Sequence, residues 1–243
     1  MTSQKPAWYS LEGGGTLTDI INLMHPPYTL WHLSYVLIGI SLAPVIHIDR
    51  SIAVLVSFFL GLGIGAHALD ETMGNPLQTR LSKSELYFIG FSSLAAAISI
   101  GLYYVFTVSL LILPIVMIEV FFALVYNLEA FGKRFHNTFV FSLSWGSIPF
   151  ITGYFVNSLS INPAILLASV SIGLLTYVQR TLSLQARSVR RKLPSSVQAL
   201  KLSNGDEVRI SEKELISPAE KSLKALSLMI FLFAIALILL RII

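Results

Sequence analysis

Seven apolar stretches, each long enough to cross a bilayer as a helix, constrain the fold of this chain more than any other feature. A hydrocarbon core about 30 Å thick needs about 20 apolar residues per helix, and lipid offers no water to an unpaired backbone. The predicted spans are residues 29–47, 51–69, 86–106, 108–126, 137–158, 162–180 and 219–242. We therefore expect an all-α, polytopic transmembrane helical bundle of about seven helices.

Composition supports lipid as the main solvent. Hydrophobic residues make up 54% of the 243 residues and charged residues only 12%, whereas a soluble domain carries about 25% charged residues. There is no Cys, which excludes disulfides and thiolate metal sites. Any metal would need His, carboxylate or carbonyl ligands.

The distribution of Lys and Arg predicts the orientation in a cell membrane. The loops at 70–85, 127–136 and 180–218 are basic, whereas the alternate loops carry only Asp49 and Arg50. The positive-inside rule therefore predicts a cytosolic N-terminus and an external C-terminus. The expected organisation is a cytosolic segment at 1–28, a six-helix membrane core at 29–180, a basic loop at 181–218 and a last transmembrane helix at 219–243.

The basic loop contains two local signals. Residues 198–210 alternate like a β-hairpin, and Asn204-Gly205 suits a type I′ turn. The run Ser217-Pro218-Ala219-Glu220 has the pattern of a capping box with Pro at the first helical position. We therefore expect a cytosolic hairpin and a final helix that begins near Ser217.

An acidic group ends the second span. His67, Asp70 and Glu71 have the spacing that places side chains on one helix face, and Asn75 follows closely. Such a set could hold a divalent cation. The alternative is a helix end at which the carboxylates are merely solvated. Carboxylates at a helix C-terminus oppose the helix dipole, which favours a functional interpretation.

Two further carboxylates belong to the candidate site. Glu119 lies inside the fourth span, where a carboxylate is costly and usually faces a cavity or a partner. Glu129 lies in the loop that follows, close to Lys133 and Arg134 and on the same side of the membrane as the acidic group. The alternative for this loop is an ordinary hydrophilic connection.

A run of arginines follows the sixth span. If that helix continues, four residues fall on one stripe, namely Arg180, Ser183, Arg187 and Arg191, with Arg190 beside it. Guanidinium groups bind phosphates through paired hydrogen bonds, so the stripe could hold a pyrophosphate. The alternative is a topology signal or a contact with anionic lipid. Nucleic acid is not expected as a partner, because no basic aromatic surface accompanies the arginines.

Several pieces of the chain resemble the UbiA-type intramembrane prenyltransferase superfamily. The likeness covers residues 25–190, and the chain looks like a divergent branch. It rests on Pro26-Pro27-Tyr28-Thr29-Leu30-Trp31, on Asn75-Pro76-Leu77 with Arg80, Ser82, Lys83 and Leu86, and on Trp145-Gly146 with Pro149 and Gly153-Tyr154. The chain departs from the family in its helix number, seven instead of nine, and in lacking the second acidic motif.

The resemblance implies a transferase that acts on a polyprenyl or other lipid (pyro)phosphate with Mg²⁺ or Mn²⁺. The implied metal ligands are His67, Asp70, Glu71 and Asn75. The implied phosphate-binding residues are Arg180, Arg187, Arg190, Arg191, Lys133 and Arg134, and Glu129 or Glu119 would assist as a base or a second metal ligand. With one acidic motif missing, at most one metal is expected.

We expect five of these side chains to line one cytosol-facing cavity, namely His67, Asp70, Glu71, Glu129 and Arg180. The alternative function is a non-catalytic lipid-binding or scaffold membrane protein that has lost the prenyltransferase motifs. A transporter is less favoured, because no pair of broken helices repeats along the chain.

Overall fold

The computed structural model describes residues 7–11, 13, 15–73, 75, 77–129, 131, 134–192, 198–201 and 203–242. Within them, six helices are long and apolar enough to span a membrane, which confirms the predicted polytopic helical bundle. They are Ile48–Glu71, Lys83–Thr107, Leu110–Asn127, Thr138–Ser158, Pro163–Arg190 and Glu212–Ile242. Helix α2 (Pro26–Leu42) has 17 residues and packs among them.

Three of the six spans are composed of more than one element. The first contains α3 (Ile48–Phe58), η1 (Phe59–Ala66) and α4 (His67–Glu71). The next are α5 (Lys83–Thr107) and then η2 (Leu110–Ile112) with α6 (Leu113–Asn127). They are followed by α7 (Thr138–Ser142), η3 (Leu143–Ser147) and α8 (Ile148–Ser158), then α9 (Pro163–Lys192) and α10 (Glu212–Ile242). A short helix, α1 (Thr16–Leu23), precedes α2.

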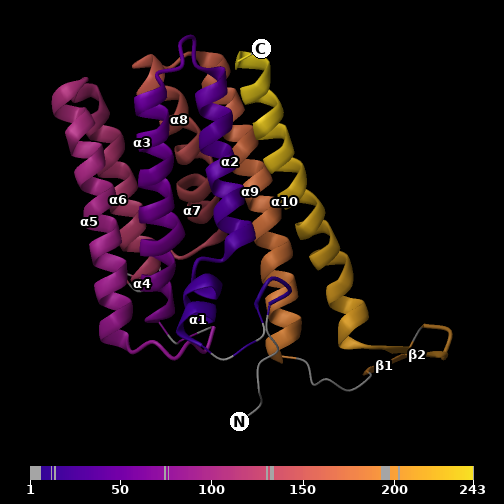
Figure 1. Ribbon diagram of the computed structural model, residues 1–243. Coiled ribbons are helices and arrows are strands. Elements are labelled where there is room, and N and C mark those ends of the chain that lie inside the picture. Colours follow the sequence, from indigo (N-terminus) through magenta and orange to yellow (C-terminus); the bar gives the residue numbers. More distant parts are fainter. Residues whose placement is uncertain are drawn as a thin grey trace.

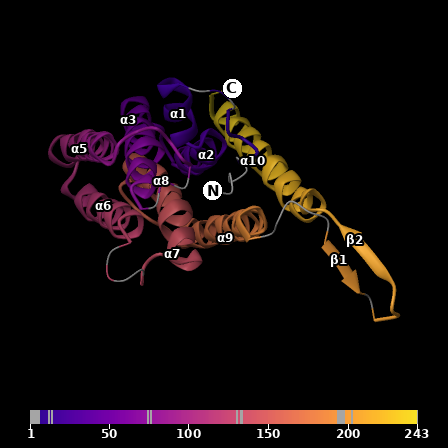
Figure 2. The ribbon, with the colours of Figure 1, turned by 90° about the horizontal axis from the view of Figure 1, so that it is seen from below.

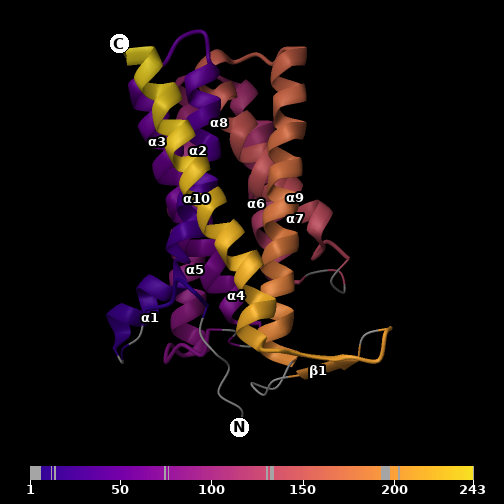
Figure 3. The same ribbon diagram turned by 90° about the vertical axis from the view of Figure 1, so that its right-hand side faces the viewer.

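The two termini lie at opposite ends of the bundle (Figure 1). We call the end that holds the N-terminus and α1 the basal end. Helix α4 ends there, α5 and α10 begin there, and the strands β1 and β2 lie there (Figures 1 and 3). The basic loops of the sequence therefore gather at one end of the molecule.

Helix α8 forms the centre of the bundle, and most of its surface is buried. It crosses α2 at a point where both helices carry glycine. A Cβ atom at Gly39 would lie 2.1 Å from the Phe150 carbonyl oxygen, and one at Gly153 would lie 2.2 Å from the Val36 carbonyl oxygen. Small residues at such crossings let two backbones approach closely inside a membrane. The contact holds α2 against the central helix.

Two spans contain π-helical segments. Segment η1, with the sequence FLGLGIGA, interrupts the helix that leads to His67, and η3 contains Trp145 and Gly146. Such segments are rare and occur frequently at functional sites. Both lie on the path from the middle of the bundle to the basal end.

Helix α9 continues well past the predicted end of the sixth span, as the arginine stripe required. It runs without a break to Lys192, so the arginines are carried on a helix that extends beyond the bundle core. Figure 3 shows α9 and α10 side by side at the basal end.

The predicted start of the last helix is wrong. Helix α10 begins at Glu212, and Pro218 lies inside it. The capping box forms earlier, because the Ser211 hydroxyl accepts from the Glu214 amide at 3.2 Å while the Glu214 carboxylate accepts from the Ser211 amide at 2.7 Å. The Ser-x-x-Glu pattern occurs twice, at residues 211–214 and 217–220, and the first of the two forms the N-terminal cap of α10.

Strands β1 (Gln198–Lys201) and β2 (Glu207–Ile210) pair in an antiparallel hairpin that projects from the bundle (Figure 2). Lys201 pairs with Glu207, so five residues separate the strands and the predicted two-residue type I′ turn is wrong. Only Gly205 takes a positive φ within the described part of this turn. The Asn204 side chain instead bonds the Asp206 amide at 3.2 Å and carboxylate at 2.7 Å.

Candidate functional site

A polar pocket of about 310 Å³ opens at the basal end. Its walls come from the N-terminal segment, α1, the start of α2, α4, α9 and the loop between α4 and α5. The charged residues that line it are Asp19, Asp70, Arg80, Arg187 and Arg190, and the other polar side chains include Tyr9, Asn22, His25, Tyr28 and Ser183. It therefore contains carboxylates and guanidinium groups at the end of a membrane bundle.

Helix α9 supplies one face of this basal pocket. Ser183, Ala186, Arg187 and Arg190 line it, and their spacing of three and four residues places them on one helix face. Arg190 is held in place by Glu220 of α10, whose carboxylate lies 2.5 Å from its guanidinium. The structure thus brings Asp70 together with two of the predicted phosphate-binding arginines.

Arg180 lies elsewhere on α9, between the pocket and the core. Its guanidinium donates to the Tyr126 hydroxyl at 3.0 Å and stands 4.6 Å above the centre of the Phe141 ring. Its buried Nε has no hydrogen-bond partner in the structure as described. It does not line the pocket, but the charges of Asp70 and Arg187 act on it. Arg180 therefore adds positive potential behind the pocket.

Stacked rings form the inner wall of the pocket. The Tyr9 hydroxyl lies 2.8 Å from His25 Nδ1, and the His25 ring stacks on His67 with centroids 4.5 Å apart. His67 in turn stacks on Trp145 at 5.8 Å and bonds the Gly63 carbonyl through Nδ1 at 3.2 Å. His67 therefore supports the pocket from behind.

The two members of this stack that line the pocket, His25 and Tyr9, are neutral at physiological pH. Burial lowers the pKa of His25 well below its usual 6.5, and the nearby His67 and Arg187 lower it further. Burial also raises the pKa of the Tyr9 hydroxyl, with a smaller contribution from Tyr28. The stack therefore offers hydrogen-bonding groups without adding charge to the pocket.

Glu71 and Asn75 hold the loop that follows α4. The Glu71 side chain is 2% exposed, and its two carboxylate oxygens each lie 3.2 Å from the Leu77 amide. Asn75 adopts a left-handed φ of 50°, and its side-chain oxygen accepts from the Thr79 amide at 2.8 Å. Both side chains therefore satisfy backbone groups of the loop, and neither lines the pocket.

The four expected metal ligands do not share one cavity. Asp70 lines the pocket, His67 stacks behind it, and Glu71 and Asn75 are directed into the loop. Among the residues that the structure describes, no group of three or more His, Asp or Glu side chains could hold a metal ion. A cation in the pocket would meet the carboxylates of Asp70 and Asp19. Asp19 Oδ2 already accepts from the Arg80 amide at 3.1 Å, which leaves its other oxygen and the Asp70 carboxylate as donors. Mg²⁺ is commonly held by one or two carboxylates together with substrate phosphates.

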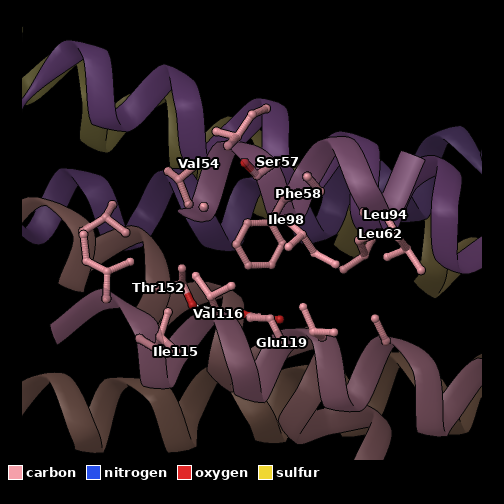
Figure 4. A pocket seen from close by; sticks show the side chains of 18 of the residues that line it. Val54, Ser57, Phe58, Leu62, Leu94, Ile98, Ile115, Val116, Glu119 and Thr152 are labelled. Carbon is pink, nitrogen blue, oxygen red and sulfur yellow. Dashed lines mark hydrogen bonds between the residues drawn. The ribbon is translucent and has the colours of Figure 1, made fainter. Parts of the chain in front are cut away.

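The remaining candidates lie apart. Glu119 lines a different, apolar cavity inside the membrane-spanning part, and its Oε1 lies 3.0 Å from the Thr152 hydroxyl oxygen (Figure 4). Glu129 follows α6 with a left-handed φ of 47°, and Arg134 is exposed in the same loop. Lys133 and the Arg191 side chain lie outside the described part of the structure.

The prediction that five side chains line one cavity is therefore wrong, since only Asp70 of that set lines the basal pocket. Sequence spacing placed Asp70 and Glu71 together, but adjacent helical residues point about 100° apart. The pocket also contains residues that the sequence did not single out, namely Tyr9, Asp19 and His25. They come from the N-terminal part of the chain, and no local pattern marks them. Tyr28, in the first turn of α2, belongs to the resemblance but was not expected in the pocket. In comparisons with protein-family models, curated proteins and solved structures, nothing matches this chain.

Proposed function

We propose that this chain is a membrane-embedded, transferase-like protein that binds a polyprenyl or other lipid (pyro)phosphate in its basal pocket. One observation carries the proposal. Asp70 lines this pocket together with three arginines, Arg80, Arg187 and Arg190, at the end of a bundle of membrane-spanning helices. A lipid phosphate has its charge at that depth and its chain in the bilayer.

Arginine geometry supports a phosphate as the bound group. A guanidinium presents a planar fork of donors that matches two phosphate oxygens, and each charge-assisted hydrogen bond is strong. Arg187 lies between Ser183 and Arg190 on the pocket face of α9. The neutral Tyr9–His25 pair, which uses one of its two hydrogens internally, can donate one hydrogen bond without repelling an anion.

A divalent cation, Mg²⁺ or Mn²⁺, is part of the proposal. Asp70 and Asp19 would hold it together with the phosphate oxygens of the lipid. When bound, it would neutralise charge on a leaving pyrophosphate. Arg187 and Arg190 would orient the phosphates, while Arg180 would add positive potential from behind through its contact with Tyr126.

The finer parts of the family resemblance are proposals of the same kind. We infer a divergent UbiA-like bundle with a cytosolic basal end, an external C-terminus and the β1–β2 hairpin as a cytosolic insertion. The gathering of Arg80, Arg187 and Arg190 at the basal end supports this orientation. Of the two candidate bases, Glu129 lies in the basal loop after α6 and Glu119 lines another cavity, and neither lines the basal pocket.

A second candidate function is non-catalytic lipid binding. The observation that favours it is the use of Glu71 and Asn75 to bond the backbone of Leu77 and Thr79. This leaves Asp70 as the sole member of the acidic motif on the pocket wall. A protein that retained the phosphate pocket and lost the chemistry would show this pattern.

Isothermal titration of the full chain in detergent with geranylgeranyl pyrophosphate tests the proposal. We expect saturable binding that Mg²⁺ or Mn²⁺ tightens, and loss of that gain in Asp70→Ala. Arg187→Ala should weaken binding by roughly 1.5–3 kcal/mol with or without metal, the value of a lost hydrogen bond to a charged group. Arg134→Ala is the matched control, because Arg134 is basic, basal and exposed but does not line the pocket.

Three outcomes separate the alternatives. No binding, or equal losses in Arg187→Ala and Arg134→Ala, would contradict the phosphate site. Binding that is indifferent to metal and to Asp70 would favour the non-catalytic candidate. Release of pyrophosphate from the bound lipid, measured with a membrane lipid extract as the source of acceptors, would favour the transferase.

A further inference from the structure

A second cavity lies within the membrane-spanning part of the bundle and shares no lining residue with the basal pocket. It measures about 140 Å³ and is bounded by the α3–η1 helix, α5, α6 and α8. Its walls are mostly apolar, and the side chains include Val54, Phe58, Leu62, Leu94 and Val116 (Figure 4). An apolar molecule of the bilayer fits such walls.

Glu119 is the carboxyl group of this cavity. It lies near the middle of α6, where the surrounding side chains are apolar, and it faces Thr152 of α8 (Figure 4). Carboxyl groups at this depth are costly and are generally retained for a function. Arg50 also lines the cavity, but its guanidinium donates to the Val156 carbonyl at 3.3 Å.

The hydrogen bonds around Thr152 indicate which form Glu119 takes. The Thr152 hydroxyl oxygen lies 2.9 Å from the Ile148 carbonyl oxygen and 3.0 Å from Glu119 Oε1. A hydroxyl has one hydrogen, and a carbonyl can only accept. If Thr152 donates to Ile148, Glu119 must donate to Thr152 as a carboxylic acid. An ionised Glu119 would instead place a charge against apolar walls at a cost of several kcal/mol.

In the acid form, Glu119 leaves one acceptor for a ligand. Its Oε1 hydroxyl is used by Thr152, so the other oxygen, Oε2, is a carbonyl acceptor beside the cavity. Such an acceptor pairs with a ligand that donates a hydrogen bond. A lipid ketone or quinone has no hydrogen to donate, and a lipid amine would need an ionised partner. The complement is a neutral hydroxyl on an apolar chain.

We propose that this cavity binds the hydroxyl end of a lipid alcohol, with the hydroxyl donating to Glu119 and the first carbons of its chain packed along Val54, Phe58 and Leu62. At about 140 Å³ the cavity holds only this end of the molecule, and the rest of the chain would lie among the bilayer lipids. The inference goes beyond the phosphate site, because the ligand is neutral and no residue of the basal pocket takes part. The two cavities would hold two different lipids, one recognised by charge and the other by a single hydrogen bond.

The test is binding of tritiated geranylgeraniol to the full chain in nanodiscs, measured by scintillation proximity. Wild type should bind saturably. Glu119→Leu, which keeps the volume and removes the acceptor, should weaken binding about tenfold, equivalent to about 1.4 kcal/mol. Glu119→Gln should stay within about threefold of wild type, because its amide can donate to Thr152 and its oxygen can still accept. Thr152→Val should weaken binding by several fold, because Glu119 then loses the group that orients it.

Met117→Ala is the matched control, since Met117 also lies on α6 but faces outward and is 63% exposed. Melting temperatures of all variants show whether each is folded. The proposal is overturned if wild type does not bind geranylgeraniol saturably, if Glu119→Leu binds like wild type, or if Glu119→Gln is as weak as Glu119→Leu. The last result would mean that an ionised carboxylate is required. Geranylgeranyl pyrophosphate, titrated in parallel, reports separately on the basal pocket.

Discussion

The carboxylate of Glu220 lies 2.5 Å from the guanidinium of Arg190 and joins the basal ends of α10 and α9. Arg190 also lines the basal pocket, so this ion pair reduces the positive charge that Arg190 presents to a ligand. The Arg190 side chain is 15% exposed and the Glu220 side chain is 23% exposed. They form a link between the packing of the last helix and the electrostatics of the pocket.

Glu220→Gln should therefore tighten binding of geranylgeranyl pyrophosphate, because Arg190 becomes free to pair with phosphate. We expect a gain of about threefold and a stability loss of roughly 0.2–1 kcal/mol, the usual value of a partly exposed pair. Calorimetry and thermal melting measure the two effects. Glu214→Gln serves as control, since Glu214 is on the same helix but caps its start at Ser211. Weaker binding in Glu220→Gln would contradict the role given to Arg190.

The crossing of α2 and α8 should not tolerate side chains. Gly153→Ala places a Cβ 2.2 Å from the Val36 carbonyl oxygen, so the helices must separate. We expect a loss of roughly 1–3 kcal/mol, typical of overpacking, and a lower melting temperature in detergent. Gly61→Ala is the control, because the nearest atom to its Cβ, on Ala97, is at 3.4 Å. Equal melting temperatures for the two variants would show that the crossing is looser than described.

Substitution of Glu71 can distinguish a structural role of this residue from a metal-binding role. If its main task is to accept from the Leu77 and Thr79 amides, Glu71→Ala should cost roughly 1–3 kcal/mol for the buried donors left unsatisfied. Mg²⁺ should stabilise wild type and Glu71→Ala by the same increment in thermal melting. An increment that disappears in Glu71→Ala but persists in Asp70→Asn would make Glu71 the metal ligand, as the sequence predicted.

His25 should make folding sensitive to acid. Its folded pKa lies well below the usual 6.5 because of burial, His67 and Arg187. A depressed pKa contributes stability that is fully present above the unfolded pKa and is lost as the pH falls below about 6.5. His25→Asn, which tolerates the left-handed φ of 46° at this position, should flatten this loss. Melting temperatures between pH 7.5 and pH 5 measure it, and parallel curves for the two proteins would exclude His25 as the group responsible.

Orientation can be measured directly, because the chain contains no Cys. Ser203→Cys, in the exposed turn between β1 and β2, should react with an impermeant thiol reagent only after cells are opened. Ser160→Cys, exposed between α8 and α9 at the opposite end, should react in intact cells. The reverse pattern would place the basal end outside and overturn the positive-inside prediction.

The limits of most spans could be predicted closely from sequence, because lipid leaves few alternatives to an apolar helix. Their number was not predicted correctly, since seven spans were predicted and six are found among the described residues; the first predicted span, 29–47, corresponds to the 17-residue helix α2. The second predicted span, 51–69, corresponds to the helix Ile48–Glu71, and the fifth, 137–158, to Thr138–Ser158. The ends of helices that extend beyond the apolar region were harder to predict. The Arg-rich continuation of α9 has no apolar periodicity that requires it, and two equivalent Ser-x-x-Glu patterns compete for the start of α10.

The site could be predicted only in part. Charge and spacing singled out Asp70, Arg187 and Arg190, and these three residues do line one pocket. Glu71 is not on the pocket wall because of its angular position around the helix. It points into the loop after α4, whereas Asp70 faces the pocket. Tyr9 and Asp19 reach the pocket through the tertiary placement of the N-terminal segment, and a single sequence carries no information about such long-range contacts.

Segment η1 lies directly above His67 and Asp70 in the same continuous helix. A π-helical segment holds more residues per turn than α-helix, so its conversion to α geometry would change the register of everything beyond it. Each residue gained or lost turns an α-helix by about 100°. Such a shift would carry Asp70 off the pocket wall and separate His67 from His25. The π-helical geometry of η1 thus sets the angle around the helix axis at which the Asp70 carboxylate faces the arginines.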